Sequence, residues 1–210
     1  MPNKIYGVLD VYVAPIPQNA RIEKVYPDAR YEEIRSCASE KVRIQKYLVW
    51  KLLESAVADS FGLNFNSLEF KKDKSGKWSC GKVEFSLSHS ANAVAVAVSD
   101  KEVGVDIELV RNIPYEKLAQ KILTQSERAV FAALKESERK GYILERWTRK
   151  ESLYKRSGIC AFSHADVDGQ AFLTRNIEIQ GKKYVLSVCA EQVKNFRLIR
   201  YSNSKYARKN

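Results

Sequence analysis

The chain has 210 residues, 45% of them hydrophobic and 29% charged, which is the composition of an ordinary soluble globular protein. No stretch approaches the roughly 20 consecutive apolar residues that a membrane-spanning helix needs. Residues 1–17 lack the long apolar core and small-residue cleavage site of a signal peptide. We therefore expect a cytoplasmic protein without a membrane partner, built as one large domain or two small ones.

The net charge of +11, from 36 basic and 25 acidic residues, favours an anionic partner. A nucleic acid, a phosphorylated small molecule and an acidic protein all fit this charge, and so does a basic surface that only keeps the protein in solution. The four cysteines form no C-x-x-C pair and the chain has two histidines, so we expect reduced cysteines and no zinc site.

The first half of the chain predicts a strand, then helices, then strands. Residues 5–13 have the composition of a strand, and residues 27–58 carry a broad apolar stripe at helical spacing, starting after Pro27. A lysine-rich turn follows at residues 71–77. Three further strands are predicted, the middle one a small, β-branched run that suits a buried position: residues 82–90, 92–101 and 102–110.

The second half predicts helices followed by strands. Residues 114–158 are mostly helical, with a capping box at Thr124 and Glu127 and a helix end at Gly158. A hairpin turning at Gln180–Gly181 and a final strand follow. The segments are helices at residues 115–123, 124–137 and 144–158, the hairpin at 176–192 and the strand at 196–202.

Both halves place a helix before a β-rich run, "AVAVAVSD" in the first and "YVLSVCAE" in the second. This repetition predicts an α+β protein of two similar halves, residues 1–110 and 111–210, packed against each other as an intramolecular pseudo-dimer. Because such a protein contains both halves of its site, we expect a monomer.

Residues 104–110, "GVDIELV", carry two carboxylates inside an apolar run. Residues two apart in a strand face the same side, so Asp106 and Glu108 share one face while Val105 and Ile107 face the core. Adjacent carboxylates repel, and more strongly as water is removed. The face is therefore either open to solvent or binds a divalent cation. Mg²⁺ suits it, because Mg²⁺ combines few protein carboxylates with water and phosphate oxygens.

Two further stretches carry polar residues that are candidates for a site. In residues 146–158, Trp147, Glu151 and Lys155 lie close to one helical face, either as a surface ion pair beside a packed tryptophan or as part of a site. In "FSLSHS", residues 85–90, His89 lies where a strand meets a turn. It is either a structural histidine or a contact for phosphate or ribose.

Together these stretches resemble the 4'-phosphopantetheinyl transferase superfamily, in its larger, pseudodimeric (surfactin-synthetase-activating) type. "FSLSHS" is similar to that family's Ser-His strand end, "GVDIE" to G-[IV]-D-[IV]-E, and "WTRKESLYK" to W-[ST]-x-K-E-[AS]-x-x-K. "SGKW", residues 75–78, is similar to the family's G-K-P with tryptophan in place of proline. The motif-bearing part spans residues 76–158. The chain departs from the family in having Ala29 and Glu32 where lysines are common.

The resemblance implies roles for the residues that match these motifs. Asp106, Glu108 and Glu151 would bind Mg²⁺, or Mn²⁺ in its place. Lys155 would contact the phosphates of coenzyme A. Our candidate acceptor for the proton of the attacking serine is Glu151, directly or through a metal-bound water. The residues at the nucleotide end of coenzyme A would be Lys46, Lys77, Ser88 and His89. The site would lie between the halves, with the nucleotide and the metal-binding strand on the first half and the carrier protein on the second.

The resemblance further implies a transferase with coenzyme A as its substrate. It would move the 4'-phosphopantetheine arm to a serine of an apo acyl or peptidyl carrier protein, in fatty acid or secondary metabolite biosynthesis, and release adenosine 3',5'-bisphosphate. Carriers of this class are acidic, which fits the basic charge, and no nucleic-acid partner is expected. The alternatives are a basic module that binds nucleic acid or a carrier without catalysis, and another Mg²⁺-dependent phosphoryl enzyme, although the chain has no Gly-rich P-loop.

Overall fold

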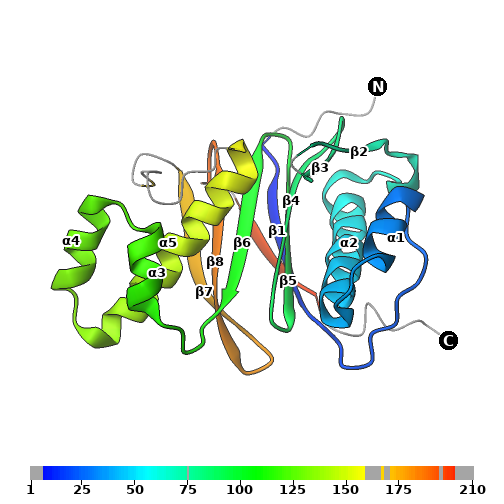
Figure 1. The fold of residues 1–210 in the computed structure, drawn as a ribbon. Helices are drawn as coiled ribbons and strands as arrows, with labels where there is room; N and C mark the ends of the chain where they lie inside the picture. The colour runs from blue at the N-terminus through cyan, green and yellow to red at the C-terminus, as the bar shows by residue number, and fades with distance from the viewer. Residues whose placement is uncertain (1–6, 75, 159–166, 168–170, 194–195, 202–210) are drawn as a thin grey trace.

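Two β-sheets lie side by side in the middle of the molecule, and helices cover the outer face of each (Figure 1). The structure is a computed structural model, which describes residues 7–74, 76–158, 167, 171–193 and 196–201. Its mixture of helices and antiparallel strands confirms the expected α+β class. None of the helices in these residues is long and apolar enough to cross a membrane.

The first sheet has the strand order β4-β5-β1-β9. Neighbouring strands are antiparallel except for β9, which lies parallel to β1 at the edge. Every residue of β5 is buried, as expected for a strand covered on both faces. The strands are β1 (Leu9–Pro15), β4 (Glu84–Ser90), β5 (Ala93–Ser99) and β9 (Arg197–Arg200).

Two helices, α1 (Asp28–Arg35) and α2 (Glu40–Phe61), replace the single helical region predicted from residue 27. The break between them falls before Ser39, whose side chain accepts a hydrogen bond from the backbone of α2 and so begins a new helix. A short 3-10 helix (Phe65–Ser67) and a small hairpin of β2 (Phe70–Lys72) and β3 (Trp78–Cys80) follow. The hairpin presents the predicted lysine-rich turn.

The second sheet has the order β6-β8-β7, with all neighbours antiparallel. The predicted hairpin turn is confirmed, since Gln180 and Gly181 join β7 and β8 with φ angles of 49° and 72°. The strands are β6 (Val103–Leu109), β7 (Phe172–Ile179) and β8 (Lys182–Ala190).

Three helices, α3 (Tyr115–Ile122), α4 (Gln125–Ala133) and α5 (Glu136–Ser157), lie on the outer side of the second sheet: α5 packs on the sheet, and α3 and α4 pack against α5 (Figure 1). The capping box of Thr124 and Glu127 is confirmed. The last helix begins at Glu136, well before the predicted start at residue 144. The Glu138 side chain accepts a hydrogen bond from the backbone N–H of Lys135, which stabilises this earlier start.

Sheet membership does not follow the expected division at residue 110. β6, expected in the first half, pairs with β8 in the second sheet, and β9 returns from the end of the chain to the first sheet. The sheets therefore divide between β5 and β6. Cys160 and His164 lie outside the described residues.

Apolar side chains form three cores: between α1–α2 and the first sheet, between the two sheets, and between the second sheet and α3–α5. The middle core explains why strands of both sheets read as continuous apolar runs. It contains Val11 of β1, Ala95 of β5, Val105 and Ile107 of β6, and Leu186 of β8.

Serine side chains of β4 join the edge strands of the two sheets. The hydroxyl oxygens of Ser86, Ser88 and Ser90 accept hydrogen bonds from the backbone N–H groups of β6, at 3.0, 3.2 and 3.1 Å. The three donors are Val105, Ile107 and Leu109. Since successive acceptors are two residues apart, the hydroxyls follow the repeat of the strand and hold β6 in a fixed register against β4.

Candidate active site

The strand β6 and the helix α5 approach so closely that one position between them accepts only glycine. A Cβ atom on Gly104 would lie 1.8 Å from the carbonyl oxygen of Ser152, far inside van der Waals contact. By the alternation of the strand, Asp106 and Glu108 share this face, while Val105 and Ile107 lie in the core between the sheets as predicted.

Asp106 is buried and bound by two partners. Its Oδ1 atom lies 2.7 Å from the Lys155 ammonium group and accepts a hydrogen bond of 2.8 Å from the hydroxyl of Ser88. Its Oδ2 atom has no hydrogen-bond partner within the described residues although it is buried. A buried carboxylate oxygen without a donor is costly, so this atom is a candidate ligand for a cation.

Two glutamates complete the group of acids. The Ser90 hydroxyl donates to Glu108 at 2.7 Å. Burial raises the pKa of Glu108, and the charge of Asp106 raises it further against the hydrogen bond from Ser90. Burial also raises the pKa of Glu151, with further increases from Asp106 and Glu108 and a decrease from Lys155. The three carboxylates thus lie close enough to repel one another.

Repulsion among three acids and the unpartnered oxygen of Asp106 fit a divalent cation held by oxygen ligands. The side chains do not form a closed ligand set, because no group of three His, Cys, Asp or Glu residues among those described is arranged to hold a metal ion. In this structure Asp106 forms an ion pair with the ammonium group of Lys155.

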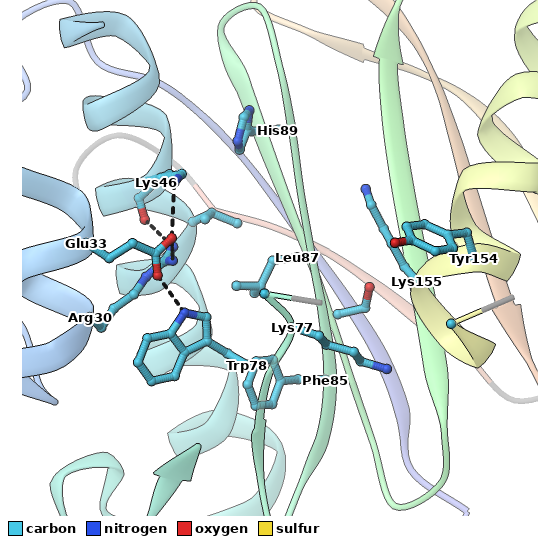
Figure 2. A pocket seen from close by; sticks show the side chains of 14 residues that line it. Arg30, Glu33, Lys46, Lys77, Trp78, Phe85, Leu87, His89, Tyr154 and Lys155 are labelled. Atoms are coloured by element: carbon cyan, nitrogen blue, oxygen red, sulfur yellow. Dashed lines mark hydrogen bonds and ion pairs between the residues drawn. The ribbon is translucent and has the colours of Figure 1, made fainter. Parts of the chain in front are cut away.

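A cavity of about 350 Å³ opens between the two helical layers (Figure 2). Arg30, Glu33 and Lys46 come from α1 and α2 on one side, and Lys155 comes from α5 on the other. His89 of β4 and Lys77 also line it. The structure therefore brings together four of the five residues predicted to bind coenzyme A: Lys46, Lys77, His89 and Lys155.

Ser88, the fifth, does not line this cavity. Consecutive strand residues point to opposite faces, so Ser88 faces β6 while His89 faces the cavity. The Ser88 hydroxyl contacts Asp106 and lies 3.0 Å from the Lys155 ammonium group. The structure thus places Ser88 beside the carboxylates and Lys155 and outside the lining of the cavity, and its contact with the nucleotide end of coenzyme A stays a prediction.

His89 lies in a positive environment. Burial, followed by the charges of Lys155, Lys46 and Arg30, lowers the pKa of His89 to about 4. The imidazole is therefore neutral at pH 7 in the ligand-free protein. A bound phosphate would add the negative charge that these groups lack.

A cluster around Glu33 was not found from the sequence. Glu33 accepts from Trp78 at 2.8 Å and forms ion pairs with Arg30, Lys46 and Lys72. The spacing of Arg30 and Glu33 on one helical turn suggests their pair, but Trp78 lies 45 residues further along the chain. Only the tertiary structure joins them.

Lys150 belongs to the "WTRKES" motif but had no predicted role. It is buried, and its ammonium group donates hydrogen bonds of 2.7 Å to the backbone oxygen of Ile122 and 2.7 Å to Glu127. Glu127 also caps α4. Lys150 therefore anchors α5, directly before Glu151, to the α3–α4 connection.

A second pocket, of about 360 Å³, opens beside Glu108 and is lined by Leu144 and Trp147 of α5. Trp147 lies at its edge, partly buried against the third core as expected from the sequence. Apolar side chains form much of its wall and three exposed cations flank it: Arg111, Lys117 and Lys121.

Comparison with known proteins shows which family the chain is similar to. A sequence profile of the 4'-phosphopantetheinyl transferase superfamily matches residues 102–205. The chain is 24% identical to the 4'-phosphopantetheinyl transferase Sfp of Bacillus subtilis over 158 residues, which are 74% of this chain and 70% of that protein. It is 27% identical to the transferase ffp of Bacillus subtilis over 159 residues, with the same coverage of 74% and 70%.

A third relative, the 4'-phosphopantetheinyl transferase AcpT of Salmonella typhimurium, is 35% identical over 86 residues, or 40% of this chain. The match spans 45% of the length of AcpT. The matched profile includes the strand with Asp106 and Glu108 and the helix with Glu151 and Lys155. Over residues 102–205 the chain is similar to the 4'-phosphopantetheinyl transferase superfamily, and the match to Sfp extends beyond this range.

Proposed function

We propose that this protein transfers the 4'-phosphopantetheine arm of coenzyme A to a serine of an apo acyl or peptidyl carrier protein. The observation that carries the proposal is that Asp106, Glu108 and Glu151 gather near Lys155, which lines a cavity rich in cations. Cations and acids in this arrangement suit a ligand that carries a pyrophosphate next to a nucleotide.

In the proposed reaction, the serine oxygen forms a bond to the phosphorus that carries the pantetheine arm. The bond from this phosphorus to the bridging oxygen breaks, and adenosine 3',5'-bisphosphate leaves with the electron pair. Lys155 stabilises the charge that develops on the phosphate oxygens. Glu151 accepts the serine proton, directly or through a water molecule.

We further propose that Asp106, Glu108 and Glu151 hold a Mg²⁺ ion. The unpartnered Oδ2 of Asp106 and the repulsion among the three carboxylates support this assignment. When bound, the ion would neutralise charge on the pyrophosphate. Lys155 would then be released from Asp106 to contact phosphate.

The pocket beside Glu108 is the proposed docking site for the carrier protein. Its apolar wall and its flanking cations suit an acidic partner that brings apolar side chains next to its reactive serine. Glu108 belongs both to this pocket and to the group of acids, so a serine entering here would reach the pyrophosphate. The charge complementarity favours a carrier over a nucleic acid.

The two sheets with their helices are proposed to be related halves of a monomeric pseudo-dimer. Two similarities support this: β4-β5-β1 in one sheet has the same order as β7-β8-β6 in the other, and α2 and α5 each have 22 residues. In this arrangement the halves are residues up to β5 and residues from β6, and β9 crosses back to the first.

Intact-protein mass spectrometry of an apo carrier incubated with this protein, coenzyme A and Mg²⁺ tests the function. We expect a gain of one phosphopantetheine mass, lost with a chelator. Asp106→Ala and Glu151→Gln should each lower the transfer rate at least about 100-fold with an unchanged circular dichroism spectrum.

Full transfer by Asp106→Ala would contradict the metal assignment alone. No gain on any of several acyl and peptidyl carriers, from folded protein, would contradict the transferase. A melting temperature raised by an oligonucleotide, and not by coenzyme A with Mg²⁺, would then indicate the nucleic-acid-binding alternative.

A further inference from the structure

We propose that Glu33 is an internal counter-ion of the nucleotide cavity, which competes with the phosphate monoester of coenzyme A for Lys46 and Lys72. This inference rests on the proposed function, because it concerns the end of the same cavity remote from the carboxylates. It assigns a role in affinity and specificity to an acid on α1.

Both carboxylate oxygens of Glu33 are fully used (Figure 2). Oε1 lies 3.1 Å from Arg30 Nη1 and 3.0 Å from Lys46 Nζ. Oε2 lies 3.2 Å from Lys72 Nζ and accepts a hydrogen bond of 2.8 Å from Trp78 Nε1. Four donors on one carboxylate, three of them cationic, resemble the surroundings of a bound phosphate more than those of an ordinary ion pair.

The charges of this cluster do not cancel. Arg30, Lys46 and Lys72 carry three positive charges against one on Glu33. The excess of two matches a phosphate monoester, which carries about −1.5 to −2 at pH 7. Arg30 also keeps its Nε–H unpartnered although its side chain is 5% exposed. A buried, unpartnered donor in the wall of a cavity is suited to an anionic ligand.

The three cations differ in their freedom to move. Arg30 is fixed, since it donates to the backbone oxygen of Lys46 at 3.2 Å and lies over the Trp50 ring at 4.8 Å. The Lys46 and Lys72 side chains are 29% and 39% exposed. These two lysines can therefore turn from Glu33 toward a ligand while Arg30 stays with Glu33.

Glu33 remains charged throughout the working pH range. Burial alone would raise its pKa, but the charge of Arg30 and the hydrogen bonds from Trp78, Lys46 and Lys72 outweigh burial and lower the pKa to about 2. A ligand phosphate must therefore always compete with a carboxylate for the lysines. The competition weakens binding of ligands that carry the monoester and leaves dephospho-coenzyme A, which lacks it, almost unaffected.

The test is calorimetric binding of coenzyme A and of dephospho-coenzyme A, without carrier, to the wild type and to Glu33→Gln. We expect Glu33→Gln to bind coenzyme A about tenfold more tightly and dephospho-coenzyme A less than about threefold more tightly. Glu54→Gln is the matched control: it removes the same charge from a partly exposed pair with Lys51 outside the cavity and should change both affinities less than about twofold.

Lys72→Met provides a second test. Lys72 lies on a partly exposed hairpin, and its replacement leaves the ion pair between Glu33 and Arg30 in place. It should weaken coenzyme A binding about fivefold without changing dephospho-coenzyme A binding. Equal or weaker binding of coenzyme A by Glu33→Gln, or an unchanged affinity in Lys72→Met, would overturn the counter-ion role alone. Wild-type protein that is folded but binds no coenzyme A would overturn the proposed function with it.

Discussion

Gly104 fixes the distance between the strand that carries Asp106 and Glu108 and the helix that carries Glu151 and Lys155. Its missing side chain lets the backbone of Ser152 approach to a distance at which a Cβ atom would overlap it. The atoms involved are backbone atoms of a helix, which cannot rotate away as a side chain can. A side chain here must move α5 as a whole.

Gly104→Ala should therefore lower the free energy of unfolding by about 3 kcal/mol and reduce transfer, measured by urea denaturation and by carrier modification. Gly141→Ala on the exposed side of α5 is the control. Apart from its chain neighbours and the nearby backbone of its own helix, no atom of the described residues lies within 4 Å of its Cβ position, so replacing this helical glycine should stabilise the protein by about 0.5–1 kcal/mol. Equal stability of the two variants would refute the close packing.

At this scale, the sequence predicted most of the site. The alternation of a strand placed Asp106 and Glu108 on one face, and the structure agrees. The same alternation separates Ser88 from His89, but the resemblance to the family led us to group them. The partners of Glu33 could not be predicted, because Trp78 and Lys72 reach it from a hairpin that is distant in the sequence.

The elements β4 and β6 meet in an unusual way. Each is an edge strand of its own sheet, and serine hydroxyls of β4 bind the backbone N–H groups of β6 where another strand's carbonyl groups would normally do so. The apolar run of β6 predicted a buried strand but did not specify its partner, so the sequence-based boundary at residue 110 placed it with the wrong sheet. Pairing of edge strands depends on tertiary packing.

Ser86→Ala tests this junction without altering a residue that touches a carboxylate. The variant leaves the buried N–H of Val105 without its acceptor at 3.0 Å. We expect the free energy of unfolding to fall by about 1–2 kcal/mol and amide exchange at Val105 to accelerate. Urea denaturation and hydrogen exchange measure the two effects.

Ser55→Ala is the control for this substitution, because the Ser55 hydroxyl only donates to the Lys51 carbonyl within α2. It should change stability by less than about 0.5 kcal/mol. If Ser86→Ala matches it, and exchange at Val105 is unchanged, the core between the sheets holds β6 in register without the serines.

Across the whole molecule, the basic residues that give the net charge of +11 differ in what they contact and in how exposed they are. Some cations are committed to partners inside the fold, such as Lys150 with Glu127 and Arg197 with Asp10. Others line the nucleotide cavity, where the protein limits screening by salt. The cations that line the second pocket are exposed to solvent and can act on an approaching partner from a distance.

The two substrates should therefore respond differently to salt. Raising the salt concentration from 50 to 500 mM should increase KM for an acidic carrier severalfold and KM for coenzyme A much less, because exposed charges are screened beyond about 10 Å at 0.1 M.

Lys117→Gln with Lys121→Gln should raise KM for the carrier about fivefold at low salt and remove most of its salt dependence. The double variant Lys41→Gln with Lys82→Gln takes the same charge from exposed sites outside this pocket, and it should retain the salt dependence of the wild type. If both double variants lose capture equally, net charge attracts the carrier and the pocket beside Glu108 has no special part in docking.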